Sequence, residues 1–189
     1  MTVLKGIDLS NWQAGFDISA ARPGFVIAKA TEGTTYVDRY CDGFIQDCLK
    51  LDIPFGFYHF ARFNDAAAEA KFFYENTRGY IGKGIPVLDF EVANSNEWLE
   101  TWCKTYHDLA GVYPWVYMSA DYINMSSDYL NNRGYGTDWV KSNCGLWLAG
   151  YPKSYTNYPN VDCPYAHTGW TLAAWQFTSS LAKIGRAHV

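Results

Sequence analysis

Short apolar runs recur along the whole chain, and several are followed by a stretch with helical spacing. The runs are rich in β-branched and aromatic residues, a composition that favours strands. Strands that alternate with helices form βα units, which predict a largely parallel sheet covered by helices. The predicted strands are residues 4–8, 25–30, 55–60, 85–91, 115–119, 145–149 and 171–177.

Three amphipathic helices are predicted between these strands. The first covers residues 38–51, where apolar side chains recur at helical spacing. The second is rich in alanine and begins after the cap candidate Asn64 or Asp65. The third begins after Ser95, carries one continuous apolar stripe and ends before Gly111. The helices therefore fall in the first two thirds of the chain.

The helical signal weakens after Ser119, and residues 152–169 are rich in proline, asparagine, tyrosine and threonine. This composition predicts a long loop between two strands. The chain has 189 residues, a length that suits one domain with one core. Seven strands with few helices at the end of the chain predict an α/β fold, namely an incomplete or irregular β/α barrel.

Composition excludes several classes of partner. The net charge of −4 and the lack of a basic run argue against nucleic acid, since phosphate binding needs clustered lysine and arginine. Apolar runs are too short for membrane insertion, and the first residues do not resemble a secretory leader. The five cysteines lack zinc-ligand spacing, and we expect mostly free thiols.

Aromatic residues are unusually frequent, at 18% of the chain with 8 Trp and 15 Tyr. Their rings combine an apolar face with a polar edge, which suits a sugar as well as a protein core.

Polar side chains follow the predicted strands at the edge where a parallel barrel carries its active site. Asp8 ends the first strand, and Tyr58 lies near the end of the third. Asp89 and Glu91 end the fourth, and Gln176 lies in the last. Because side chains alternate along a strand, Asp89 and Glu91 face the same side, with Cα atoms roughly 6.5–7 Å apart.

Two adjacent acids oppose each other's ionisation, so that one of their pKa values rises. Such a pair at a strand end, with a third acid on another strand, predicts acid catalysis. The four histidines show no paired ligand spacing, so we expect no metal, and His59 fits a hydrogen-bonded barrel residue better than a ligand.

Six motifs, in order along the chain, resemble those of the family 25 glycoside hydrolases, the Chalaropsis-type lysozymes that phages and bacteria use as lysins. They are Gly6-Ile7-Asp8-Leu9-Ser10 with Trp12-Gln13, Phe25 to Gly33, Gly56 to Phe60, Leu88 to Glu91, Leu146 to Tyr151 and Trp175-Gln176-Phe177. The resemblance covers residues 4 to about 180.

The resemblance implies an irregular TIM-like (β/α)5(β)3 barrel and hydrolysis of the β-1,4 bond from N-acetylmuramic acid to N-acetylglucosamine in peptidoglycan, without a cofactor. It makes Glu91 the proton donor and Asp89 the partner that assists the substrate's acetamido group as internal nucleophile, with retention of configuration. Asp8 becomes the first-strand acid of the site. The implied sugar-binding residues are Tyr58, Tyr117, Trp147 and Gln176.

Two other functions compete with this one. A chitinase-like barrel also uses acids on its fourth strand, but its pattern is D-x-D-x-E, and here Val87 stands where the first acid would be. A module that binds cell-wall glycan without cutting it is the alternative of a different class. The intact Asp89 and Glu91 argue against it.

The end of the chain departs from the family pattern. Residues 1–180 are expected to form the catalytic domain, whereas residues 181–189 form an atypical tail that resembles an artificial sequence. The family's last strand, with its aspartate, is therefore expected to be missing or replaced. We expect a monomer that acts at the bacterial cell wall, in which an open barrel edge could allow dimerisation.

Overall fold

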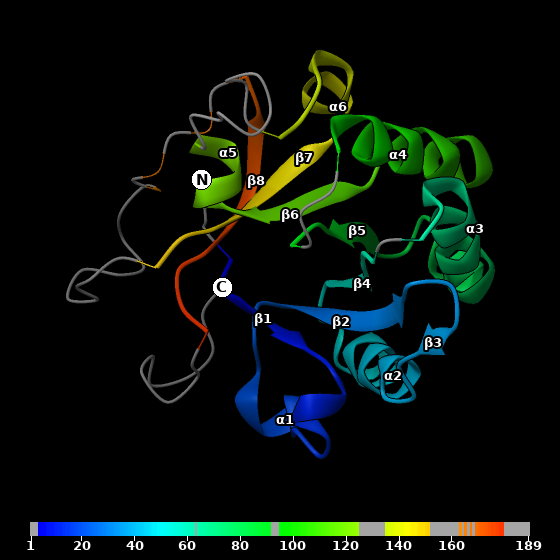
Figure 1. Cartoon of the computed structure of the whole chain (residues 1–189). Coiled ribbons are helices and arrows are strands. Elements are labelled where there is room, and N and C mark those ends of the chain that lie inside the picture. Colours follow the sequence, from blue (N-terminus) through cyan, green and yellow to red (C-terminus); the bar gives the residue numbers. More distant parts are fainter. Residues whose placement is uncertain are drawn as a thin grey trace.

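The computed structural model describes residues 4–62, 64–91, 95–124, 135–151, 163, 165, 167 and 169–179. It contains one eight-stranded sheet with helices around it (Figure 1). The strands are β1 (Gly6–Leu9), β2 (Phe25–Glu32), β3 (Tyr36–Val37), β4 (Phe55–Phe60), β5 (Ile85–Asp89), β6 (Trp115–Ser119), β7 (Gly145–Ala149) and β8 (Thr171–Gln176).

Seven of these strands follow one another in the order β1-β2-β4-β5-β6-β7-β8, and every pair along this path is parallel. The short β3 pairs with β2 in the antiparallel direction. The sheet curls into a partial barrel, with helices along its outer side (Figure 1). All seven predicted strands are therefore confirmed. Glu91 lies just beyond the end of β5, although the sequence placed it inside the strand.

The helices are α1 (Ile18–Ala21), α2 (Cys41–Leu51), α3 (Ala66–Thr77), α4 (Asn96–Ala110), α5 (Ala120–Asn124) and α6 (Asp138–Asn143), with 3-10 turns η1 (Asn11–Gln13) and η2 (Arg78–Tyr80). Asp65 and Ser95 cap α3 and α4, as predicted. Gly111 ends α4 at a φ of 71°, a left-handed conformation that glycine adopts without strain. Periodicity did not predict α1, α5 or α6, because helices of four to six residues make too few turns to establish a pattern.

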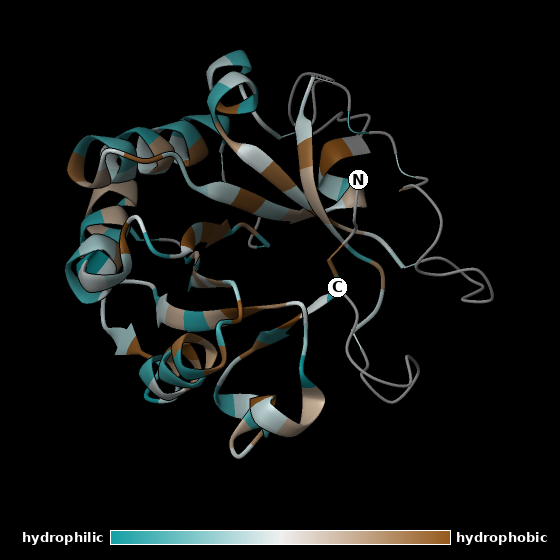
Figure 2. Cartoon of the chain, turned by 180° about the vertical axis from the view of Figure 1, so that it is seen from behind, coloured by the Kyte–Doolittle hydropathy of each residue, from teal (hydrophilic) through white to brown (hydrophobic). Residues whose placement is uncertain are grey.

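Alternate residues of each strand face opposite sides of the sheet. One set, which includes Phe57, Leu88 and Val116, packs against the helices in the main core. The other set forms a smaller cluster inside the partial barrel, around Val87 and Trp147. Brown, hydrophobic residues accordingly occur along the strands, whereas the helices alternate between hydrophobic and teal, hydrophilic residues (Figure 2). This alternation decides which polar residues can reach the barrel interior.

The partial barrel is open in the part of the chain that the structure describes, where no backbone pairing joins β1 to β8. The tail at residues 181–189 and most of the predicted loop at 152–169 lie outside the described residues. None of the described helices is long and apolar enough to cross a membrane. All five cysteines are free, and four of them are buried.

Candidate active site

A pocket of about 250 Å³ lies at the carboxyl ends of the parallel strands. All seven residues predicted for the site line it, namely Asp8, Tyr58, Asp89, Glu91, Tyr117, Trp147 and Gln176. Ser10, Trp12, Lys29 and Phe60 complete the lining, and sequence reasoning did not assign them to the site.

Strand register explains why residues far apart in sequence meet here. Tyr58 on β4 lies level with Lys29 on β2. Asp89 on β5 pairs with Tyr117 on β6, which in turn pairs with Trp147 on β7. Neighbours at one level of a sheet point to the same face, so these side chains enter the interior together.

Asp89 is buried, with 9% of its surface exposed, and its Oδ1 atom has no hydrogen-bond partner among the described residues. Burial raises the pKa of Asp89 well above its usual value, and the nearby charge of Glu91 raises it further. Glu91 itself is exposed at the end of the strand. Its pKa is also raised, mainly by desolvation, although an interaction with Tyr117 opposes this shift. The two acids therefore differ in access to solvent.

Asp8 belongs to a hydrogen-bonded group that crosses the pocket. Gln176 Nε2 donates to Asp8 Oδ2 at 2.9 Å. The Oε1 atom of Gln176 accepts hydrogen bonds from the Tyr117 and Tyr151 hydroxyls, each at 2.7 Å. Burial raises the pKa of Asp8, whereas its hydrogen bond from Gln176 lowers it. Gln176 thus holds the acid of the first strand in a fixed position.

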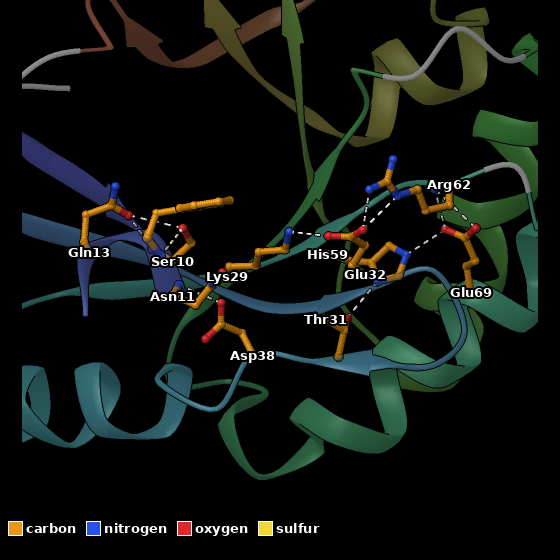
Figure 3. Close-up of polar contacts among 11 residues, drawn as sticks. Ser10, Asn11, Gln13, Lys29, Thr31, Glu32, Asp38, His59, Arg62 and Glu69 are labelled. Atoms are coloured by element: carbon orange, nitrogen blue, oxygen red, sulfur yellow. Dashed lines mark hydrogen bonds and ion pairs between the residues drawn. The ribbon is translucent and has the colours of Figure 1, made fainter. Parts of the chain in front are cut away.

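Lys29 brings a positive charge into the acidic pocket. Its ammonium forms an ion pair with Glu32 at 2.5 Å, and Arg62 Nε donates to the other oxygen of Glu32 at 2.8 Å (Figure 3). The ammonium also lies 4.8 Å from the centre of the Phe60 ring, within cation–π range. Its charge lowers the pKa values of both Asp89 and Glu91. The sequence does contain a signal for Lys29. It lies two residues after Ile27, which faces the barrel interior, and alternation along the strand puts both side chains on the same side.

His59 lies outside the pocket, in a buried group with Thr31 and Glu69 (Figure 3). Its Nε2 is 2.8 Å from Glu69 Oε2, and its Nδ1 is 2.7 Å from Thr31 Oγ1. Burial lowers the pKa of His59, so the ring is neutral, donating to the carboxylate and accepting from the hydroxyl.

This hydroxyl–imidazole–carboxylate series has the composition of a nucleophilic triad, but all three residues have 0% exposure, so no substrate can reach the hydroxyl. It joins β2, β4 and α3, and the prediction of a hydrogen-bonded barrel histidine is confirmed. No group of three metal-ligating side chains occurs within the described ranges.

Comparison with known proteins gives one consistent family. The family model described as "Glycosyl hydrolases family 25" matches residues 7–185. The autolytic lysozyme of Clostridium acetobutylicum is 29% identical over 170 residues, covering 86% of this chain and 48% of that protein. An N,O-diacetylmuramidase of Arthroderma benhamiae is 28% identical, covering 90% of this chain and 77% of that protein.

A solved structure has the same architecture. The family GH25 lysozyme of Aspergillus fumigatus superposes with a TM-score of 0.75 at 28% identity, covering 99% of this chain and 91% of that one. The chain spans about half of the length of the clostridial relative.

Proposed function

The chain belongs to glycosyl hydrolases family 25, and on this premise we propose that it is a peptidoglycan N-acetylmuramidase. The bond cleaved is the β-1,4 link from N-acetylmuramic acid to N-acetylglucosamine. The observation that carries this proposal is the Asp89 oxygen, buried in the pocket beside Glu91 without a hydrogen-bond partner among the described residues.

A buried carboxylate with an unpartnered oxygen costs folding free energy. Trp147 adds a second unpartnered group to the pocket lining, because its buried Nε1 has no acceptor in the described part of the chain. A bound sugar with an acetamido group supplies both an N–H donor and oxygen acceptors. The two groups therefore support a ligand of this chemistry.

Glu91 is assigned the role of proton donor because of its access. A donor must reach the oxygen of the scissile bond and exchange its proton with water, and Glu91 is exposed at the pocket. Its raised pKa keeps the carboxyl protonated to a higher pH than that of an ordinary glutamate. Both properties suit general acid catalysis.

Asp89 is assigned to the acetamido group because it is buried where solvent exchange is poor. The substrate's N–H can donate to Asp89 Oδ1, which favours the ionised form of this carboxyl. The resulting carboxylate then stabilises the positive charge that develops on the acetamido group.

The reaction proceeds in two steps. The acetamido oxygen attacks the anomeric carbon, the glycosidic C–O bond breaks, and the Glu91 proton passes to the leaving oxygen. Water then attacks the same carbon, the ring formed by the acetamido group opens, and Glu91 takes the proton from that water. Two displacements retain the configuration, and substrate-assisted enzymes are exceptions to the rule that relates carboxyl separation to outcome.

The other predicted residues are proposed to bind and orient the sugar. Tyr58, Tyr117 and Trp147 offer aromatic surface in the pocket, and Asp8 and Gln176 offer hydrogen-bonding groups. We place the catalytic domain at residues 1–180 and its site of action at the bacterial cell wall, as a monomer.

The test is the chemistry of the products. Purified peptidoglycan is incubated with the protein, and the released fragments are reduced and analysed by mass spectrometry. N-acetylmuramic acid at the new reducing end is expected, together with falling turbidity of the wall suspension. A protein that only binds glycan would leave the turbidity constant and create no reducing ends.

A further inference from the structure

Trp12 is the most exposed large hydrophobic side chain among the described residues, at 86%. It also lines the pocket, together with the deeply placed acids. Most of the apolar surface of this indole is left uncovered by the protein, so a ligand in the pocket can gain stabilisation by covering it.

The backbone that carries Trp12 is fixed by a set of hydrogen bonds (Figure 3). The turn η1 begins with a capping box, in which Ser10 N donates to Gln13 Oε1 at 2.9 Å and Trp12 N donates to Ser10 Oγ at 3.3 Å. Such a box satisfies N–H groups that a short turn would otherwise leave free. Trp12 therefore stands on a rigid support.

A buried carboxylate strengthens this support from another part of the chain. Asp38 is 2% exposed, and its Oδ2 accepts the backbone N–H of Asn11 at 2.8 Å (Figure 3). Its Oδ1 accepts the backbone N–H of Tyr40 at 3.0 Å. The turn under Trp12 is thus tied to the segment that leads into α2. A ring whose support is already ordered binds a ligand with little loss of backbone entropy.

We propose that Trp12 is a sugar-binding platform that stacks on a ring of the glycan strand next to the sugar at the acids. This inference rests on the proposed function, because it takes the same polymer as ligand. An uncharged N-acetylated sugar has an apolar face of C–H groups that matches an indole ring. The residue is outside the reacting group of acids and contributes to binding along the strand.

The experiment measures affinity for peptide-free peptidoglycan glycan strands of defined length by calorimetry. All proteins carry Glu91→Gln, so that no strand is cut during the titration. Trp12→Ala is expected to weaken binding of long strands roughly tenfold, the loss expected from uncovering one face of a large apolar side chain. The shortest fragment, a single sugar that reaches only the acids Asp89 and Glu91, should bind equally well with or without the ring.

Three further variants complete the design. Trp12→Phe keeps an aromatic face and should restore most of the affinity, whereas Tyr113→Ala removes an aromatic ring that is 41% exposed away from the pocket and should change nothing. Gln13→Ala weakens the capping box and should lower affinity only when Trp12 is present, as a double-mutant cycle detects.

Equal affinity of Trp12→Ala and its parent for long strands overturns the platform. So does a loss of self-association in sedimentation that leaves glycan affinity unchanged, because the ring would then contact a second copy. If the protein without Glu91→Gln releases no reducing ends while long-strand binding still depends on Trp12, the proposed hydrolysis fails and the platform stands.

Discussion

Gln176 on the last described strand donates a 2.9 Å hydrogen bond to Asp8 on the first, across a sequence separation of 168 residues. No backbone pairing joins β1 to β8 in the described part of the sheet, so this side-chain bond links the two strands at the pocket. The same hydrogen bond therefore holds the two end strands of the partial barrel together and fixes the position of Asp8 in the site.

We expect Gln176→Met to be harmful although it conserves the size of the side chain. The change removes the donor to Asp8 and the oxygen that accepts from the buried Tyr117 and the exposed Tyr151 hydroxyls. A buried polar group that loses its partner costs about 1–3 kcal/mol, whereas the exposed Tyr151 hydroxyl can bond to water instead. The free energy of unfolding, measured in urea, should therefore fall, and kcat/KM on cell walls should fall with it. An unchanged urea midpoint would show that the bond contributes nothing.

Glu91→Gln should remove activity while preserving glycan binding. An amide cannot protonate the leaving oxygen, so the rate of reducing-end release should fall by about 10²–10⁴-fold. The fold should be retained because Glu91 is exposed. Residual activity above roughly a tenth of the starting rate would contradict the assignment of Glu91 as general acid.

Asp89→Asn should lower activity severely and yet stabilise the protein at neutral pH. The folded-state pKa of Asp89 is raised above an unfolded value near 3.9, so the native state binds more protons than the unfolded state. The free energy of unfolding therefore decreases as pH rises from the unfolded-state pKa towards the raised folded-state pKa of Asp89. An asparagine cannot ionise, so the variant avoids the cost of a buried charge at neutral pH. Each kcal/mol gained in the free energy of unfolding should raise Tm by about 2–4 °C.

The control for Asp89→Asn is the pH dependence of the Tm difference. The variant's advantage should be largest near neutrality and should disappear below about pH 4, where the aspartate is protonated in both states. A difference that is constant with pH would mean that charge burial is not its cause.

Lys29→Met should move the pH–activity profile. Lys29 lowers the pKa values of Asp89 and Glu91, whereas Asp8 raises both, and Glu32 raises that of Asp89. Removal of the cation raises the pKa of both acids, so both limbs of the kcat/KM profile should shift to higher pH. Lys29→Arg keeps the charge and should restore the original profile. A lower rate with both limbs in place would instead assign Lys29 a purely structural role.

The sequence allowed prediction of the acids because strand ends and alternation are local properties. Asp89 and Glu91 follow an apolar run at a spacing of two, which predicted that they share one side of the sheet, and both line the pocket although Glu91 lies just beyond β5. The support of Trp12 was not predictable in the same way, because Asp38 contacts a turn 27 residues away. The ion pair between Lys29 and Glu32 was not predictable either. Strict alternation puts residues three apart on opposite faces, but the strand has a register shift between Lys29 and Thr31.

The alternation of side chains along each strand also separates positions that pack against the helices from positions that can be varied to change ligand binding. Residues that face the helices, such as Leu88, pack in the main core, whereas their neighbours Val87 and Asp89 face the barrel interior, where Asp89 lines the pocket. A library that varies only the inward positions can therefore search for new wall specificities while the packing against α3 and α4 stays intact.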